Sequence, residues 1–427
     1  MAVHLIKNFR DLAVTETRRD ALEILEAGLK AINTHAAVKH AVKLRDSRLT
    51  INGQSWNLKE YKRIYVIGIG KAAAEAGCAL EDLLGSRITG GILLDVKTVK
   101  TKILKSIAGT HPLPTEKNVR ATAEILDLLR NLASDDLVIV IVSGGGSALL
   151  CQPYQIRCDQ LARITEVLMK NGATIQEINT VRKHLSEVQG GQLARLAYPA
   201  TMIGLVFSDV PGNDLDVIAS GPTILDMTTV DDARAVIDRY ELFTTCRIPD
   251  CDLRETPKDP IFFQHVTNIL LICNGVALDA MERKARALKY KVRVYSKAQD
   301  GEARKAGELL AGLPKKGEVV LAAGETTVIV KGKGRGGRNQ ELALGALRAI
   351  KSDVLVLSCA SDGIDNTPVA GAIADQMTKE GAERLHLNPK TFLDRNDAFA
   401  FFQKCGSFIL TGVTGANVSD LMISIRK

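Results

Sequence analysis

Hydrophobic positions along the chain follow helical spacing in some segments and form short continuous runs in others. From Arg10 to about Ala37, apolar residues recur at helical spacing in a charged background, which predicts an amphipathic helix or helix pair. The glycine-bearing segment RLTINGQSWNL then predicts a β-hairpin. Beyond it, apolar runs and helical patterns alternate. Repeated β-then-α order indicates a parallel sheet covered by helices on both faces.

The expected elements fall into two groups. In the first, strands are predicted at residues 64–69, 91–95, 137–142 and 202–207, with helices from Lys71, over 115–132 and over about 158–189. Between about Asp231 and Pro260 the pattern weakens into the polar, proline-punctuated stretch RIPDCDLRETPKDP, which we interpret as a domain boundary. Further strands are predicted at residues 268–273, 292–295, 319–322, 326–330 and 354–358. The second group is therefore also α/β.

Composition fits a soluble globular protein with more than one core. The chain has 427 residues, too many for a typical single core. Aromatic residues make up only 4%, which argues against nucleic acid as a partner. The net charge of +7 is spread along the chain; such a surplus can favour an anionic substrate, but it more often reflects ordinary surface composition.

Several features point to a cytoplasmic protein with no membrane partner. The first residues, MAVHLIKNFRDLAV, lack the apolar core of a signal peptide, and no apolar run approaches membrane-spanning length. The eight cysteines form no Cys-x-x-Cys pair and are expected to be reduced core thiols. The oligomeric state stays open, a homodimer included.

Two apolar runs break into glycines and then a helix, in RIYVIGIGKAAAEAG and DLVIVIVSGGGSALL. Glycines at such turns let backbone amides surround an anion at a helix N-terminus, and Lys71 adds a positive charge to the first. The alternative is a tight turn packed by small residues. The residues expected to bind substrate or nucleotide here are Gly68, Gly70, Ser143, Gly144, Gly145, Gly146 and Ser147.

The first glycine turn also satisfies a relaxed dinucleotide fingerprint. Gly68, Gly70 and Ala73 have the required spacing, and Asp95 ends the next predicted strand, where a ribose-binding acid would lie. Lys71 suits a phosphoryl group better than a nicotinamide cofactor. The turn is not a Walker A loop, because the four-residue spacer and the Gly-Lys-Ser/Thr ending are absent.

Acidic and basic residues add further candidates. Asp209 follows a predicted strand in SDVPGND, where a carboxylate can hold Mg²⁺ or accept a proton from a hydroxyl nucleophile, or simply make a turn. In GRGGRNQE, Arg335 and Arg338 flank bare glycine backbone and Asn339 is the expected helix N-cap, which predicts a second anion site. Asp362 and Asp365 in SDGID are candidate Mg²⁺ ligands or ordinary turn residues.

An ordered set of motifs carries a family resemblance. GIGKAA, GTHPLPT, VSGGGSALL, NTVRKHLSEVQGGQLA, SDVPGND, SGPT, GETTV, GRGGRNQE, SDGID and TGVTGANVSDL resemble the glycerate 2-kinases whose C-terminal part is the MOFRL domain. The resemblance runs from about Arg10 to the last residues. It implies a Rossmann-like domain over residues 1–250, a smaller α/β MOFRL-type domain over 251–427, and an active site in the cleft between them.

The resemblance also implies an activity and a set of site residues. The activity is ATP- and Mg²⁺-dependent transfer of phosphate to the 2-hydroxyl of D-glycerate. The implied catalytic residues are Lys71, Arg338 and Asp209. The further residues expected to bind substrate or nucleotide are Asn213, Glu325, Arg335, Gly336 and Gly337. Which glycine loop binds glycerate and which binds nucleotide stays open, as does the choice of base or Mg²⁺ ligand for Asp209.

The sequence departs from the family pattern at two positions. Val369 stands where a carboxylate is expected, and Ala323 stands where glycine is expected before Gly324. Two other functions compete with the kinase. One is an NAD(P)H-dependent hydroxypyruvate reductase, a label that some relatives carry. The other is a sugar-phosphate-binding module of the sugar isomerase type, against which the GRGGRNQE and SDGID motifs argue, because a simple sensor has no use for a second anion site.

Overall fold

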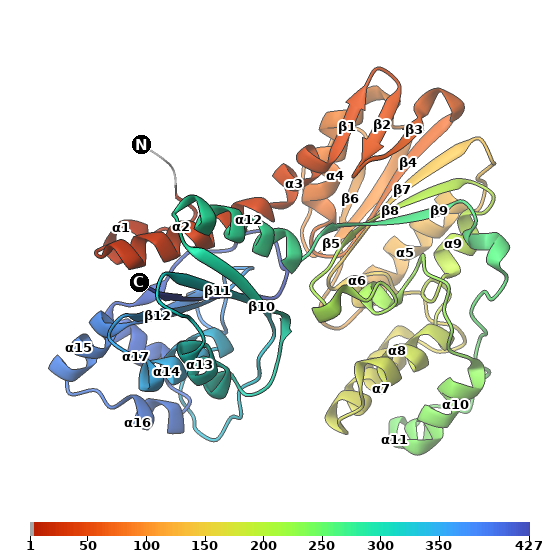
Figure 1. The fold of residues 1–427 in the computed structure, drawn as a ribbon. Helices are drawn as coiled ribbons and strands as arrows, with labels where there is room; N and C mark the ends of the chain where they lie inside the picture. Colours follow the sequence, from red (N-terminus) through yellow and green to blue (C-terminus); the bar gives the residue numbers. More distant parts are fainter. Residues whose placement is uncertain (1–3) are drawn as a thin grey trace. The chain divides into compact units, whose positions relative to one another are not determined.

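The structure, a computed structural model, describes residues 4–427 and divides into two compact units. We call Thr34–Leu271 the parallel-sheet unit. The mixed-sheet unit combines the chain up to Asn33 with Ile272–Lys427. Figure 1 shows both units, with labels on most of their helices and strands.

Six strands form the main sheet of the parallel-sheet unit, in the order β6-β5-β4-β7-β8-β9. Their bounds are β4 (Arg63–Ile69), β5 (Gly90–Asp95), β6 (Lys105–Ala108), β7 (Asp136–Ser143), β8 (Thr201–Phe207) and β9 (Val266–Ile272). Each pairing from β6 to β8 is parallel. Counted along the chain, the order is 3-2-1-4-5-6, which confirms the Rossmann-like prediction. The order reverses between β4 and β7, and ligands in such sheets bind at the loops that leave the reversing strands.

Helices cover both faces of this sheet. Those closest to it are α4 (Ala73–Leu84), α5 (Glu116–Leu129) and α9 (Gln192–Ala197). Ile92 and Leu94 of β5 share a core cluster with Ile125 of α5. Leu93, between them, lies against Gly77 of α4. Successive strand side chains point to opposite faces, so α4 and α5 lie on opposite sides of the sheet, as predicted.

A small antiparallel sheet and a group of helices complete the parallel-sheet unit. These elements are α3 (Thr34–Ala41), β1 (Val42–Arg45), β2 (Arg48–Ile51), β3 (Gln54–Asn57), α6 (Gly146–Leu149), α7 (Cys158–Lys170), α8 (Ile175–His184), α10 (Val230–Arg239) and α11 (Leu242–Cys246), with short 3-10 turns at Leu58–Glu60, Gly85–Arg87, Pro211–Asn213, Ile218–Ser220 and Pro260–Phe263. The strands β2 and β3 form the predicted hairpin. Asn52 and Gly53 at its turn have φ of 45° and 88°, the left-handed values that two-residue hairpin loops require.

The mixed-sheet unit contains six strands in the order β10-β11-β15-β12-β13-β14. They are β10 (Lys291–Gln299), β11 (Glu318–Gly324), β12 (Val354–Ala360), β13 (Gly371–Ala374), β14 (Phe408–Ile409) and β15 (Asp420–Arg426). Only β10 and β11 pair in parallel. Its helices are α1 (Phe9–Leu12), α2 (Glu16–Ala31), α12 (Asn274–Ala287), α13 (Ala303–Gly312), α14 (Arg338–Ala349), α15 (Gln376–Arg384), α16 (Pro389–Asp394) and α17 (Ala398–Cys405).

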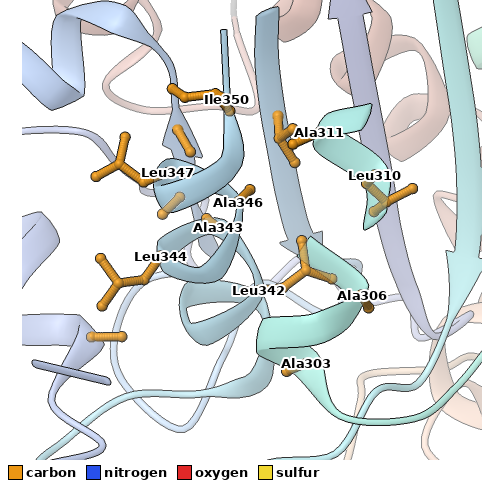
Figure 2. Close-up of a cluster of buried hydrophobic side chains, with 14 of the residues drawn as sticks. Ala303, Ala306, Leu310, Ala311, Leu342, Ala343, Leu344, Ala346, Leu347 and Ile350 are labelled. Carbon is orange, nitrogen blue, oxygen red and sulfur yellow. The ribbon is translucent and has the colours of Figure 1, made fainter. Parts of the chain in front are cut away.

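Helices α13 and α14 pack so closely that their backbones are in contact. Figure 2 shows their alanine and leucine side chains meeting in one buried cluster, which also includes Ala322, Val356 and Met422 of the sheet. A Cβ on Gly307 of α13 would overlap the carbonyl oxygen of Leu342 in α14. This close contact fixes the position of α14, the helix that begins with Arg338.

The compact units divide the chain at other places than residue 250. Helix α2 belongs to the mixed-sheet unit, where Arg18 donates to both carboxylate oxygens of Asp375 at 2.6 and 2.7 Å. Strand β9, expected in the second domain, lies instead at the edge of the first sheet. The polar stretch before it is a surface connection within one unit. Composition marks such a stretch without showing which sheet the next strand joins.

Other differences from the predicted elements are local. Residues 326–330 form no strand; Thr327 makes only an isolated bridge with Glu302. The strands β1, β6, β13, β14 and β15 were not predicted from the sequence. All eight cysteines are free thiols, five of them buried. Among the described residues, no helix has both the length and the apolar character needed to cross a membrane.

Candidate active site

The loop after β4 is tied to its neighbours through its backbone. The amide of Lys71 donates to the carbonyl of Gly144 at 3.0 Å, and the amide of Ala72 donates to Ser143 Oγ at 3.1 Å. Gly70 has φ of 110°, and a Cβ there would overlap Ser143, so this close approach requires glycine. These amides hold the fold together and do not cradle an anion. The group that this loop offers to a ligand is the Lys71 side chain.

Asp95 accepts a hydrogen bond from another backbone amide near this turn. Its carboxylate is fully buried and accepts from the amides of Ala74 at 2.9 Å and Val96 at 2.6 Å. Burial raises the pKa of Asp95, although these hydrogen bonds oppose the shift. Gly68, the first glycine of the fingerprint, packs near Leu93 and Ala73. The relaxed dinucleotide fingerprint is therefore used for packing and for holding the start of α4.

The loop after β7 brings together side chains from three other segments. A Cβ on Gly144 would overlap the carboxylate of Asp209, which follows β8. A Cβ on Gly145 would lie 3.2 Å from Lys71 Cε and 3.2 Å from His111 Nε2. Gly145 has φ of 79°, so the left-handed turn and the lack of a side chain are both needed here. Lys71, His111 and Asp209 thus surround one glycine loop at the sheet's switch point.

His111 carries a titratable group into this cluster. Partial burial lowers the pKa of its imidazole, and the positive charge of Lys71 lowers it further. The imidazole is therefore neutral at pH 7, with one nitrogen able to accept and the other able to donate a hydrogen bond. His111 lies within the GTHPLPT motif but was not among the predicted site residues. The missed strand β6 is the signal that would have placed this turn at the ligand-binding edge.

Polar side chains back the same loop at Ser147. Its hydroxyl lies 2.9 Å from Ser220 Oγ, which donates to Asn179 Oδ1 at 3.0 Å. Asn179 is 4% exposed, and its Nδ2 has no hydrogen-bond partner among the described residues. Asn213, expected to bind substrate, has its backbone amide donating to the carbonyl of Val210 at 3.1 Å, and its buried Oδ1 has no hydrogen-bond partner among the described residues. Ser147 therefore sits at the end of a short chain of buried polar groups.

Arg338 is the first residue of α14 in the mixed-sheet unit. Its guanidinium donates to Asp420 from Nε at 2.5 Å and from Nη2 at 3.2 Å, and Nη2 also donates to Glu325 at 3.0 Å. Burial would lower the pKa of Arg338, but the two carboxylates outweigh it and hold the pKa above its usual range. Burial raises the pKa of Asp420 to about 7, against the opposing effect of Arg338. Glu325 is therefore a partner of Arg338.

Asp365 holds the N-terminus of α14. Its two oxygens accept from the amides of Asn339 at 3.1 Å and Gln340 at 2.9 Å. The N-cap position belongs to Gly337, which packs directly on Asp365, so the expectation of Asn339 as N-cap is wrong. Asn339 is the second residue of the helix, and its side-chain Nδ2 donates to the carboxylates of Asp365 and Asp420. Both oxygens of Asp365 thus accept hydrogen bonds from the first turn of α14. This geometry does not support the predicted role of Asp365 as a metal ligand.

The rest of the GRGGR loop is directed away from Arg338. The Arg335 guanidinium lies over the Phe399 ring, 5.1 Å from its centre, and its amide donates to Asp397 at 3.0 Å. Gly336 packs near Ala398. The two arginines therefore contact different parts of the unit.

A pocket of about 530 Å³ opens beside Arg338 within the mixed-sheet unit. Its walls come from the segment after β11, the SDGID loop and the start of β15. The lining residues are Thr326, Thr327, Val328, Val330, Arg338, Ala360, Ser361, Asp362, Ile364, Asp365, Asn366, Asn417 and Asp420. Within residues 4–427, no group of three or more His, Cys, Asp or Glu side chains is arranged to hold a metal.

Comparison with known proteins places this architecture in a family. Residues 20–250 match a domain of unknown function (DUF4147), and residues 318–420 match the MOFRL family. A glycerate 2-kinase from Pyrococcus horikoshii is 34% identical over 96% of this chain and 97% of its own length. A D-glycerate 2-kinase from Thermotoga maritima is 34% identical over 95% of this chain and 97% of its own. The chain belongs to the MOFRL-domain glycerate 2-kinase family.

Similarity to this glycerate 2-kinase family extends to mammals and to solved structures. A glycerate kinase from Rattus norvegicus is 32% identical over 95% of this chain and 92% of its own length. The crystal structure of glycerate kinase from Thermotoga maritima matches with a TM-score of 0.86 at 32% identity, over 96% of this chain and all of that chain. The likeness therefore covers both compact units.

The two departures from the glycerate 2-kinase pattern lie at buried positions. Val369 is 5% exposed, and its carbonyl accepts from the amide of Asp365 at 2.9 Å. Ala323 is fully buried in β11, opposite Leu421 of β15. In this chain both side chains belong to the core around the SDGID loop and β11.

Proposed function

We propose that this chain transfers the γ-phosphoryl group of ATP to the 2-hydroxyl of D-glycerate, giving 2-phosphoglycerate and ADP. The proposal rests first on one observation: Lys71, His111 and Asp209 meet around the β7 loop, at the switch point of a doubly wound sheet. Membership in the glycerate 2-kinase family supports the same reaction.

Each charged group has a role in phosphoryl transfer. This reaction depends mainly on alignment of the reactants and on stabilising charge on the transferring group. We assign Lys71 and Arg338 to the oxygens of that group. We assign Asp209 to the 2-hydroxyl of glycerate, which it orients or from which it accepts a proton. The neutral imidazole of His111 is available as a hydrogen-bond partner for substrate.

Mg²⁺, when bound with ATP, neutralises phosphate charge. This cation usually keeps several waters and takes one or two carboxylates together with phosphate oxygens, which agrees with the lack of a larger acidic group in the described chain. Asp362 is half-buried on the pocket wall, and one of its oxygens accepts from the amide of Ile364 at 3.0 Å. We assign Asp362, and not Asp365, to the cation.

The reductase alternative is weakened by Asp95. Binding of a nicotinamide dinucleotide would need this carboxylate at the ribose, whereas it is buried against the start of α4. The sensor alternative does not account for the pair of half-buried Arg338 with buried Asp420 beside the pocket of the mixed-sheet unit.

A single assay tests the proposed function against its rivals. The full chain is incubated with ATP, Mg²⁺ and D-glycerate, and the product is identified by phosphorus NMR. We expect 2-phosphoglycerate. Formation of 3-phosphoglycerate alone would contradict the proposal. So would the absence of any phosphorylated product, together with oxidation of NADPH in a parallel incubation with hydroxypyruvate.

A further inference from the structure

The pocket beside Arg338 has the size and wall chemistry of a nucleotide site. We propose that the mixed-sheet unit binds the adenine nucleotide as its Mg²⁺ complex in this pocket, and that D-glycerate binds at the β7 loop of the parallel-sheet unit. This inference rests on the proposed function and adds to it the assignment of each substrate to one unit.

Size is the first argument. The pocket encloses about 530 Å³. Sites for ligands of the size of a nucleotide measure about 300–1,000 Å³. A three-carbon acid would leave most of this volume to water. A base, a ribose and phosphates together fill it.

Apolar side chains at the pocket supply a surface for the base. Val330 is 73% exposed and Ile364 is 43% exposed, and both line the pocket together with Val328. Ligand sites typically combine such apolar walls with a few oriented polar groups. A base lying against these side chains removes their apolar surface from water.

Thr326 supplies an unused polar group. The residue lines the pocket and is 2% exposed, and its hydroxyl has no hydrogen-bond partner among the described residues. A buried polar group without a partner destabilises the folded protein. A ribose hydroxyl or phosphate oxygen in the pocket would satisfy it. The pocket therefore contains a hydroxyl that needs a ligand.

The charges on the pocket wall favour a nucleotide that arrives with its cation. Three carboxylates, those of Asp362, Asp365 and Asp420, line the pocket with one guanidinium. Asp365 accepts from α14 amides, and Asp420 pairs with Arg338. We therefore assign Asp362 to the cation. The hydrogen bonds of Arg338 use Nε and Nη2, so we assign its Nη1 to a phosphate oxygen. Phosphates without Mg²⁺ would be repelled by these walls.

Calorimetric titration of the full chain with MgADP tests the assignment. We expect Thr326→Val to weaken binding about 5- to 10-fold, as for loss of one hydrogen bond. The exposed Thr391 of the same unit offers the matched control, and Thr391→Val should leave the Kd unchanged. Val330→Glu should weaken binding at least as much, whereas Leu385→Glu, at a residue 50% exposed outside the pocket, should not.

The cation is tested separately. We expect ADP with chelator to bind at least tenfold more weakly than MgADP, and Asp362→Asn to reduce that difference, because it removes one negative charge from the wall. Asp394→Asn, at an exposed carboxylate of the same unit paired with Lys390, is the control and should keep the difference.

The opposite results overturn the inference without touching the proposed function. An unchanged Kd in both pocket variants would place the nucleotide elsewhere. A loss of MgADP affinity in Ser147→Ala with full affinity in Thr326→Val would place it at the β7 loop. If the unaltered chain does not bind MgADP, either with or without glycerate, the pocket is not a nucleotide site. Failure of the proposed function shows differently, as absence of 2-phosphoglycerate in the NMR assay while MgADP still binds as expected.

Discussion

Lys71 is exposed, and its side chain lies beside Gly145 of the β7 loop, where its charge acts on that loop. We expect Lys71→Met to lower kcat by about 10²-fold or more, the effect of losing one preorganised charge in the transition state. Folding should be unaffected because the side chain is exposed. Lys97→Met is the matched control: this lysine is also exposed and pairs with Glu75 at 2.8 Å, and its loss should leave kcat unchanged. A normal kcat with a raised KM for glycerate would make Lys71 a binding group instead.

Arg338 differs from Lys71 because a buried carboxylate depends on it. Arg338→Met should also lower kcat by about 10²-fold, but it leaves Asp420 without its partner and so lowers the melting temperature. Adding Asp420→Asn should restore the melting temperature and leave kcat low. If Lys71 and Arg338 act on the same phosphoryl group, the Lys71→Met/Arg338→Met double variant will be much less impaired than the product of the single effects. Full multiplicativity would indicate separate roles.

The titration of His111 reports on the same cluster. Its folded-state pKa lies below 6.5 because of partial burial and the charge of Lys71. The neutral form is thus favoured by folding, and the resulting stability is present above pH 6.5 and is lost as the pH falls through the lowered pKa. NMR of the imidazole protons should give a pKa below 6.5, assigned by its loss in His111→Gln. Lys71→Met should move this pKa back toward 6.5, whereas Lys97→Met should not. No response to Lys71→Met would show that the two groups are not coupled.

At the scale of elements, the site depends on how closely the loop after β7 approaches the loop after β8. Gly144 is packed against Asp209 with no room for a methyl group. We expect Gly144→Ala to push the carboxylate away and to lower kcat by at least 10²-fold, with a loss of stability of about 1–3 kcal/mol from overpacking. Gly381→Ala in α15 is the control, because no atom lies within 4 Å of its Cβ position. Unchanged activity in Gly144→Ala would show that the position of the Asp209 carboxylate does not matter for the reaction.

Sequence alone predicted the elements whose pattern is local. The buried run of β7, the hairpin at Asn52 and the glycine loops all follow from neighbouring residues. It did not predict which amides the loops use, because Asp95 and Ser143 reach the β4 loop from other strands. Asp365 and Asp420 likewise came from distant segments that meet only in the fold. Short strands such as β6 and β14 have too few residues for a period to appear.

At the scale of the whole molecule, one buried ion pair joins the two ends of the mixed-sheet unit. Arg18 is 3% exposed, and burial would raise the pKa of Asp375, but Arg18 outweighs it and holds that pKa low. A lowered pKa means that this stability is present above about pH 4 and is lost on further acidification. Arg18→Met should cost about 3–5 kcal/mol at pH 7. In scanning calorimetry the loss should lower the transition of the mixed-sheet unit. Arg157→Met, which breaks an exposed pair with Asp159, should have little effect on either transition.

The position of β15 sets the order in which this enzyme can be assembled during its synthesis. The strand lies between β11 and β12, yet it is translated after both. Until β15 leaves the ribosome, the edges of β11 and β12 that it pairs with stay unpaired. Helix α2 then lacks part of the sheet on which it packs, and Arg338 lacks its partner Asp420. Domains fold as units during translation, so the parallel-sheet unit can fold while the mixed-sheet unit is still incomplete. A nascent chain stalled before Asp420 would thus carry a finished parallel-sheet unit and an unfinished mixed-sheet unit with exposed sheet edges, which is the form that chaperones are expected to hold.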